Sequence, residues 1–440
     1  MKEIDKVQAR KQNMRIYVLY RTLSLDLLFF YGISFLFLTQ VKGFTAAEVI
    51  SLDAIFAAFM ILLQIPATIL IERIGTRNST ILGNVFNILF LLTILLASNM
   101  TDLLIAYMFS AMCFALKDVS DPSLLNYSIP KTDRKGEIFA KLEGKANRRF
   151  HLFNAVSSVG SGLLFMINPY VPMVFALLFA IAGLAISFAF TEVYPERIHQ
   201  QKREAAMKRI KTVLAETKEG FAFIFQSERL RSLILFSGVI WGVMSLFGSY
   251  RPAILVQLGA PAVVLTMVHA SIQLGSAIAI KKQNAFHKYF RNKGLSVLLI
   301  TATLCMLFTG WIGLSQLSAK VAIMFVAILY IVNHGVRGIN GVIIQRYLAN
   351  FSNKNILPKI YSADAIIKNL FRMVIIGIGS YMLGITDTAN AMVIMGIMFI
   401  FISIGLVSYM KTRVGLKPNE YKEEDINFVK KDEVNTWCLM

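Results

Sequence analysis

Apolar runs of about 20 residues recur along most of this chain, and short polar segments separate them. A helix rises roughly 1.5 Å per residue, so each run matches the roughly 30 Å hydrocarbon core of a bilayer. The pattern therefore predicts an all-α membrane protein with twelve transmembrane helices. The predicted spans are Ile16–Gln40, Ala46–Ile71, Ser79–Ser98, Leu103–Asn126, Phe150–Ile167, Val171–Thr191, Leu233–Leu258, Val263–Ile280, Leu295–Leu314, Val321–Ile344, Ala365–Leu383 and Ala391–Met410.

The longest polar connection lies between the sixth and seventh predicted spans and divides the chain into halves. We predict an N-terminal six-helix bundle at residues 1–194, a linker at 195–231, a C-terminal six-helix bundle at 232–410 and a tail at 411–440. Within the linker, Ala205–Phe225 has the spacing of an amphipathic helix. It would either lie along the membrane surface or simply join the two halves.

Composition and charge support the membrane class. Hydrophobic residues make up 56% of the chain and charged residues only 16%, which excludes an ordinary soluble domain. The net charge of +19 could suggest nucleic acid, but 37 of the 45 Lys and Arg residues lie in the termini and in alternate connections. The positive-inside rule explains this bias, so nucleic acid binding is not needed. We predict a multi-pass protein of the cell membrane with both termini in the cytoplasm.

Charge is concentrated in the short loop between the second and third predicted spans. An acid and two arginines are costly in hydrocarbon, so together with the glycine between them they mark a tight turn at the membrane surface. These residues are Glu72, Arg73, Gly75 and Arg77. The pattern resembles the signature loop of the major facilitator superfamily, although Thr68 and Thr76 stand where that loop usually has a glycine and a basic residue.

The resemblance implies a fold of two six-helix bundles, built from inverted repeats, that transports substrate by alternating access around a midplane site. It further implies that Glu72, Arg73, Gly75 and Arg77 belong to a cytoplasmic gating loop, part of a latch between the first half and the start of the eleventh span. The stretch from Asp26 to Gly83 is most similar to bacterial drug or metabolite exporters. Ser157–Gly162 only weakly resembles the small-residue element of antiporters.

Asp26 is the candidate for proton coupling. It lies about ten residues into the first predicted span, where a charge is costly unless it faces a cavity or a partner. On a continuous helix it would share a face with Thr22, Phe30 and Ile33. The alternative is a structural carboxylate that hydrogen-bonds a neighbouring span. Tyr31 is a further candidate for the substrate cavity.

The second half supplies the opposite charge. Asn333, Arg337 and Asn340 share one face of the tenth predicted span, and Arg372 lies deeper in the eleventh than Asp364 and Lys368, which can pair. Our hypothesis is that Arg337, together with Arg372, gives the cavity a cationic wall opposite Asp26 and favours anionic substrates. The alternative is that both arginines snorkel to the interface or bind loop carbonyls.

These patterns predict a secondary active transporter, proton-coupled and directed to export of a small organic compound. Uptake of a small, anionic metabolite is the alternative, and a lipid-moving or non-transporting membrane protein is a further one. No Walker loop, zinc-protease motif or nucleophile elbow occurs, so we do not expect an enzyme. Three cysteines, Cys113, Cys305 and Cys438, indicate neither a disulfide framework nor a metal site. We expect no cofactor or metal, and a monomer whose partners are substrate, protons and the lipid bilayer.

Overall fold

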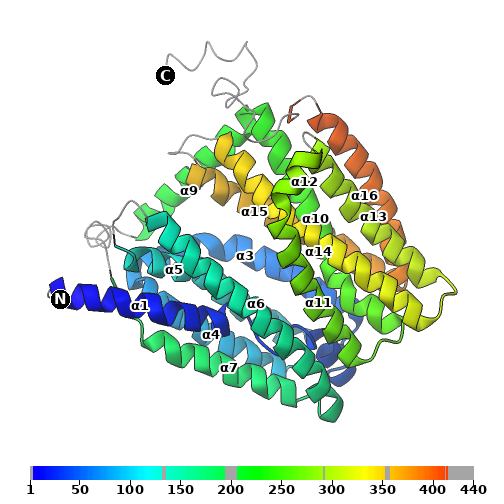
Figure 1. The fold of residues 1–440 in the computed structure, drawn as a ribbon, viewed down its shortest axis with the longest axis horizontal. Helices are drawn as coiled ribbons and strands as arrows, with labels where there is room; N and C mark the ends of the chain where they lie inside the picture. Colours follow the sequence, from blue (N-terminus) through cyan, green and yellow to red (C-terminus); the bar gives the residue numbers. More distant parts are fainter. Residues whose placement is uncertain are drawn as a thin grey trace. The chain divides into compact units, whose positions relative to one another are not determined.

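The computed structural model describes residues 3–130, 135–193, 206–290, 293–351, 357–411 and 413–414, and the regular structure of these residues is entirely helical (Figure 1). Within this part of the chain, ten helices are long and apolar enough to cross a bilayer. They are α3 (Ala46–Ile74), α4 (Thr76–Leu96), α5 (Met100–Ser128), α6 (Lys135–Ile167), α7 (Val171–Phe188), α10 (Glu228–Gln257), α13 (Gly294–Leu314), α14 (Ala319–Asn350), α15 (Leu357–Ile385) and α16 (Thr388–Met410). The all-helical membrane class is confirmed, and the count of twelve spans stays a prediction.

The other two predicted spans are less regular. The eighth corresponds to α11 (Ala262–Lys281), whose apolar part is shorter than the ten long spans. The first is divided among α1 (Glu3–Ser24), α2 (Ser34–Leu36) and a π-helical turn, η1 (Phe37–Val41). Two amphipathic helices complete the described elements, α9 (Ala206–Gln226) in the predicted linker and α12 (Gln283–Phe290).

The first predicted span is broken between residues 25 and 33, where the chain forms turns and bends. Asp26 Oδ1 accepts a hydrogen bond from the Leu27 backbone N–H at 2.8 Å, a local contact that competes with helix formation. Phe29 has a φ of 63°, in the left-handed region, so the helix cannot continue through it. The prediction of one helix over Ile16–Gln40 was therefore wrong, because an apolar run does not report such backbone contacts.

The chain divides into two compact units. The first unit comprises Met1–Lys211 and Pro261–Leu274, and the second comprises Thr212–Ala260 and Gly275–Met440. The division falls within α9 and within α11. The predicted limits at residues 194, 231 and 410 stay a prediction.

In the first unit, α5 packs against α3 and α4, α4 also packs against α7, and α1 packs against α6 and α7. Close approach of α4 and α5 depends on Gly83, since a Cβ atom at this position would lie 2.7 Å from Lys117 Cγ. At one end of α1, Tyr20 packs edge-on against Phe190 with ring centroids 5.2 Å apart. These contacts bring the polar residues of α1, α4 and α5 together inside the unit.

In the second unit, α10 packs along α15 and α13 along α16. A Cβ atom at Gly310 would lie 2.7 Å from the Ala389 carbonyl oxygen, so the backbones of α13 and α16 meet directly. Helix α9 forms where the sequence predicts it, and Glu219 of α9 pairs with Lys359 of α15 at 2.6 Å. Whether α9 lies along a membrane surface stays a prediction.

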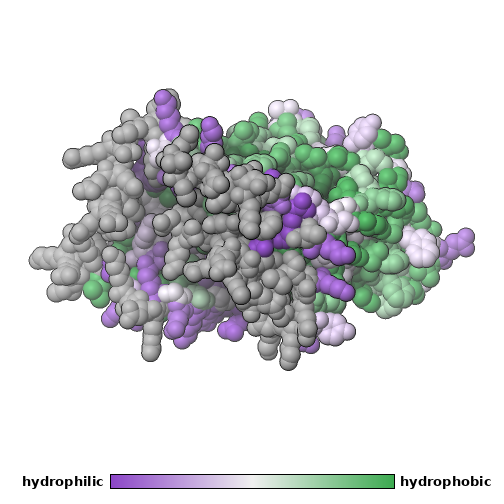
Figure 2. Space-filling view, turned by 90° about the horizontal axis from the view of Figure 1, so that it is seen from above, coloured by the Kyte–Doolittle hydropathy of each residue, from purple (hydrophilic) through white to green (hydrophobic). Residues whose placement is uncertain are grey.

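Many large hydrophobic side chains lie on the surface. Leu62, Leu96, Val156 and Phe401 expose 68%, 80%, 71% and 70% of their area. Figure 2 shows broad hydrophobic areas next to groups of hydrophilic residues. Surfaces of this kind suit helices in contact with lipid rather than with water.

Candidate functional site

Asp26 lies in the break that follows α1, and a small cavity opens beside it. The cavity has space for about one water molecule. Residues of the break, α4 and α5 line it: Leu25, Asp26, Asn87, Cys113, Phe114, Lys117 and Asp118. The Tyr31 side chain is close enough to the Asp26 carboxyl group to interact with it. Since α1 ends at Ser24, the predicted helical face with Thr22, Phe30 and Ile33 does not form.

Lys117 of α5 holds the end of α1. Its ammonium group donates to the Ser24 carbonyl oxygen, to Ser24 Oγ at 2.9 Å and to Asn84 Oδ1 at 3.2 Å. The residue is only 4% exposed. The last carbonyl groups of a helix lack partners within the helix and carry partial negative charge, so a buried cation there stabilises the helix end. Lys117 therefore fixes where α1 stops and the break begins.

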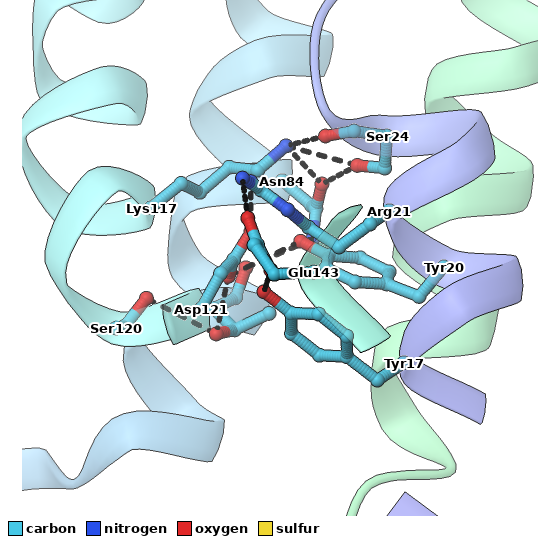
Figure 3. Close-up of polar contacts among 10 residues, drawn as sticks. Tyr17, Tyr20, Arg21, Ser24, Asn84, Lys117, Ser120, Asp121 and Glu143 are labelled. Atoms are coloured by element: carbon cyan, nitrogen blue, oxygen red, sulfur yellow. Dashed lines mark hydrogen bonds and ion pairs between the residues drawn. The ribbon is translucent and has the colours of Figure 1, made fainter. Parts of the chain in front are cut away.

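An ion cluster lies next to Lys117 in Figure 3 and joins α1 to α5 and α6. Arg21 pairs with Asp121 at 3.3 Å and with Glu143 at 3.2 Å. The Tyr17 hydroxyl donates to Glu143 Oε2 at 2.6 Å, and the Tyr20 hydroxyl to Asp121 Oδ1 at 3.5 Å. The Asp121 side chain is fully buried and that of Arg21 is 9% exposed. Buried charges are costly without partners, and the cluster pairs the Arg21 guanidinium group with two carboxylates, although Arg21 Nε has no hydrogen-bond partner among the described residues.

Arg21 and Glu143 were not among the predicted site residues. Arg21 lies inside the predicted first span, so the rule that singled out Asp26, an ionisable residue within a span, also applies to it. Glu143 gave no such signal, because it lies in a charged stretch between predicted spans. Only the packing of α6 on α1 shows that it is the partner of Arg21 and Tyr17.

The signature loop joins α3 to α4, with Gly75 at a φ of 97°, which favours glycine. Arg77 Nε donates to the Phe190 carbonyl oxygen at 2.5 Å, so the guanidinium group binds the end of α7. Glu192 accepts from the Thr76 and Arg77 backbone N–H groups at 3.1 and 2.6 Å and caps α4. Arg77 and Glu192 thus join α4 to α7 within the first unit. Arg73 is exposed and Glu72 partly buried, and the latch implied for the loop stays a prediction.

In the second unit, one face of α14 carries the predicted polar residues. The Arg337 guanidinium carbon lies 4.5 Å from the centre of the Trp241 ring. Asn333 and Asn340 are 1% and 2% exposed, and their Oδ1 atoms have no hydrogen-bond partner among the described residues. The same holds for the hydroxyl oxygen of Tyr330, whose ring stacks on Phe247 at 4.1 Å. Such unpaired buried oxygens are rare in folded proteins.

Two further arginines are close enough to Arg337 to interact electrostatically, Arg251 of α10 and Arg372 of α15. Within the described part of the chain, no acidic side chain forms an ion pair with Arg337. Asp364 pairs instead with Lys368 at 2.5 Å, as the sequence predicted. The placement of Arg337 opposite Asp26 involves both units and stays a prediction.

The cysteines and the possible metal ligands of the described residues add no further candidate site. Cys113 and Cys305 are free and buried, and Cys438 lies outside the described residues. No group of three or more metal-binding side chains is found among the residues that the structure describes.

Several solved structures share the fold over nearly the whole chain. The nucleoside transporter NupG has a TM-score of 0.71 and 10% sequence identity, and the alignment covers 92% of this chain and 99% of that one. A POT family transporter in complex with 5-aminolevulinic acid has a TM-score of 0.63 and 13% identity, covering 92% and 96%. The peptide transporter POT in complex with sulfate has a TM-score of 0.64 and 12% identity, covering 93% and 95%. At these identities the likeness concerns the fold alone.

No curated protein matches the chain by sequence. By contrast, residues 22–352 match the family model of the Major Facilitator Superfamily. This match includes the broken first span, the signature loop and the polar face of α14. The protein belongs to the Major Facilitator Superfamily, a family of membrane transporters, as the resemblance of its loop indicated.

Proposed function

We propose that the protein is a secondary active transporter that moves a small organic anion by alternating access, with the proton as coupling ion. Membership of the superfamily supports transport as the class of function. Export is the direction that the sequence favours, with uptake as the alternative. The same flux measurement distinguishes the two.

The environment of Arg337 is the observation that supports an anionic substrate. A guanidinium group inside a membrane helix is costly to bury, and two further arginines nearby increase that cost. Trp241 supplies a cation–π contact, and no described acid neutralises Arg337. A carboxylate or phosphate group on a substrate would provide the missing charge through paired hydrogen bonds.

The neighbouring oxygens favour a substrate that also donates hydrogen bonds. Asn333 Oδ1 and Asn340 Oδ1 are acceptors without donors among the described residues, and they lie four residues before and three residues after Arg337. A substrate with N–H or O–H groups next to its anionic group would satisfy them. A purely apolar substrate would leave them unpaired at a cost.

Asp26 is the proposed coupling residue in the first unit. A carboxylate in a broken transmembrane segment next to a small cavity can change its protonation state without the loss of helix hydrogen bonds. Discontinuous spans mark ion and substrate sites in many secondary transporters. Proton binding at Asp26 is therefore the step that couples the proton gradient to transport in this proposal.

The test is flux in proteoliposomes with an imposed pH gradient. The probes are an equimolar mixture of small mono- and dicarboxylic acids and phosphate esters, together with the neutral amides of the acids, all quantified by mass spectrometry. We expect gradient-driven flux of acids over amides. Arg337→Gln should reduce it by roughly tenfold or more, because a hydrogen bond to a charged group contributes about 1.5–3 kcal/mol. Asp26→Asn should remove the dependence on the gradient.

Arg148→Gln is the matched control, since Arg148 is an exposed arginine of α6. Equal flux of acids and amides in the native protein would refute the anionic substrate. Gradient-driven flux that persists in Asp26→Asn would refute the coupling role of Asp26.

A further inference from the structure

The cavity beside Asp26 contains a second carboxylate, Asp118 of α5, which the proposed function does not use. Asp118 is exposed, whereas Asp26 is partly buried. The two acids therefore line the same cavity, and Asp118 is the more exposed of them. This arrangement could give a proton a route to Asp26.

The lining of the cavity has an imbalance of charge. It contains two carboxylates, Asp26 and Asp118, and one ammonium group, Lys117, so its formal charge is −1 when all three are ionised. Lys117 is engaged by Ser24 and Asn84, as described above. In a poorly solvated setting such a charge favours the uptake of one positive charge. One proton makes the lining neutral.

Asn87 of α4 is a second, independent sign of a ligand. Its side chain lines the cavity, it is only 6% exposed, and it has no hydrogen-bond partner among the described residues. Buried amide groups are normally hydrogen-bonded to protein or to water. The space beside it suits about one water molecule, and a water there would have Asn87 and the two carboxylates as partners.

The other charged or titratable groups around the two acids are few. Tyr31 lies in the break, and Arg21 lies on α1. Cys113, Lys117 and Asp121 of α5 are close enough to interact with them. Arg21 is paired with Asp121 and Glu143, so it does not neutralise the cavity on its own.

We propose that the cavity binds one water molecule through which Asp118 passes a proton to and from Asp26. The O–H bond of the Asp118 carboxyl group breaks as its proton joins the water. A proton of that water then forms an O–H bond with the Asp26 carboxylate, and Asp118 is left ionised. This inference rests on the coupling role proposed for Asp26, and it makes Asp118 the group that exchanges protons with the surroundings.

The experiment is a laser-triggered pH jump on the purified protein in lipid vesicles, followed by time-resolved infrared spectroscopy of the carboxyl band. Asp26→Asn identifies the contribution of Asp26. We expect Asp118→Asn to slow protonation of Asp26 by tenfold or more and Asp118→Glu to restore the rate. Asn87→Leu fills the water site while both acids remain, so it should slow the same step. Asp102→Asn, at the other end of α5, is the control and should leave the rate unchanged.

An unchanged rate in both Asp118→Asn and Asn87→Leu would overturn the proposal. So would a lower pH midpoint of the Asp26 band in sodium chloride than in choline chloride, because the cavity would then hold sodium. Failure of the proposed function looks different. In that case Asp26→Asn would remove no titrating carboxyl signal, and its gradient-driven flux would equal that of the native protein.

Discussion

Arg21 offers the sharpest test of how the first unit is held together. Arg21→Met keeps most of the side-chain volume and removes the charge that faces Asp121 and Glu143. Breaking a buried ion pair by removal of one partner costs about 3–5 kcal/mol, because the other charge stays buried without compensation. Asp121 is fully buried but still accepts a hydrogen bond from Thr80 at 2.8 Å. We therefore expect the lower end, about 3 kcal/mol, or roughly a hundredfold change in the ratio of folded to unfolded protein.

The assay is equilibrium unfolding in mixed micelles, with Arg15→Met as the matched control. Arg15 lies on the same helix and is exposed, so its loss should change the free energy of unfolding by no more than about 0.5 kcal/mol. The double variant Arg21→Met with Asp121→Asn should lose less than the two single variants added together, since it removes both charges. If Arg21→Met costs no more than Arg15→Met, the cluster does not stabilise the unit and this reasoning is wrong.

Three further predictions concern stability, measured in the same assay. Glu192→Ala should cost about 1–2 kcal/mol, because it uncaps α4. The control is Glu216→Ala, at a partly buried glutamate of α9, and a cost of Glu192→Ala below that of the control would contradict this prediction. Gly83→Ala should cost about 1–3 kcal/mol, because the new methyl group would displace Lys117. An unchanged free energy of unfolding would show that α4 and α5 can move apart at no cost. For Asp387, the N-cap of α16, burial raises the pKa, but hydrogen bonds from its neighbours outweigh burial and hold the pKa below 3.8. The ionised Asp387 therefore stabilises the protein above pH 3.8, and this stabilisation is lost as the pH falls through the folded pKa. We expect the loss in the free energy of unfolding caused by Asp387→Ala to shrink in acid. A loss that does not change with pH would refute this prediction.

Long apolar runs allowed most of the fold to be predicted from the sequence. The second predicted span, Ala46–Ile71, corresponds to α3 (Ala46–Ile74), which continues through Pro66 and ends at Gly75. The first span was predicted wrongly. Asp26 and Phe29 adopt backbone contacts and dihedral angles that hydropathy does not register.

The candidate site was predicted in part. Asn333, Arg337 and Asn340 lie on one face because a long regular helix carries them, and spacing alone is enough to place residues on such a helix. The partners of each residue were harder to predict. Arg77 binds the end of α7, and Glu143 reaches Arg21, through contacts between segments more than 100 residues apart.

The joint between α4 and α7 has a practical consequence. Arg77 and Glu192 occupy the terminal backbone groups of these two helices, and separation of the helices at this end would leave several of those groups unpaired at once. A pair of spin labels placed on α4 and α7 beside this joint should therefore report one constant separation through the whole transport cycle. That constant distance would serve as an internal reference for measuring movements elsewhere in the protein.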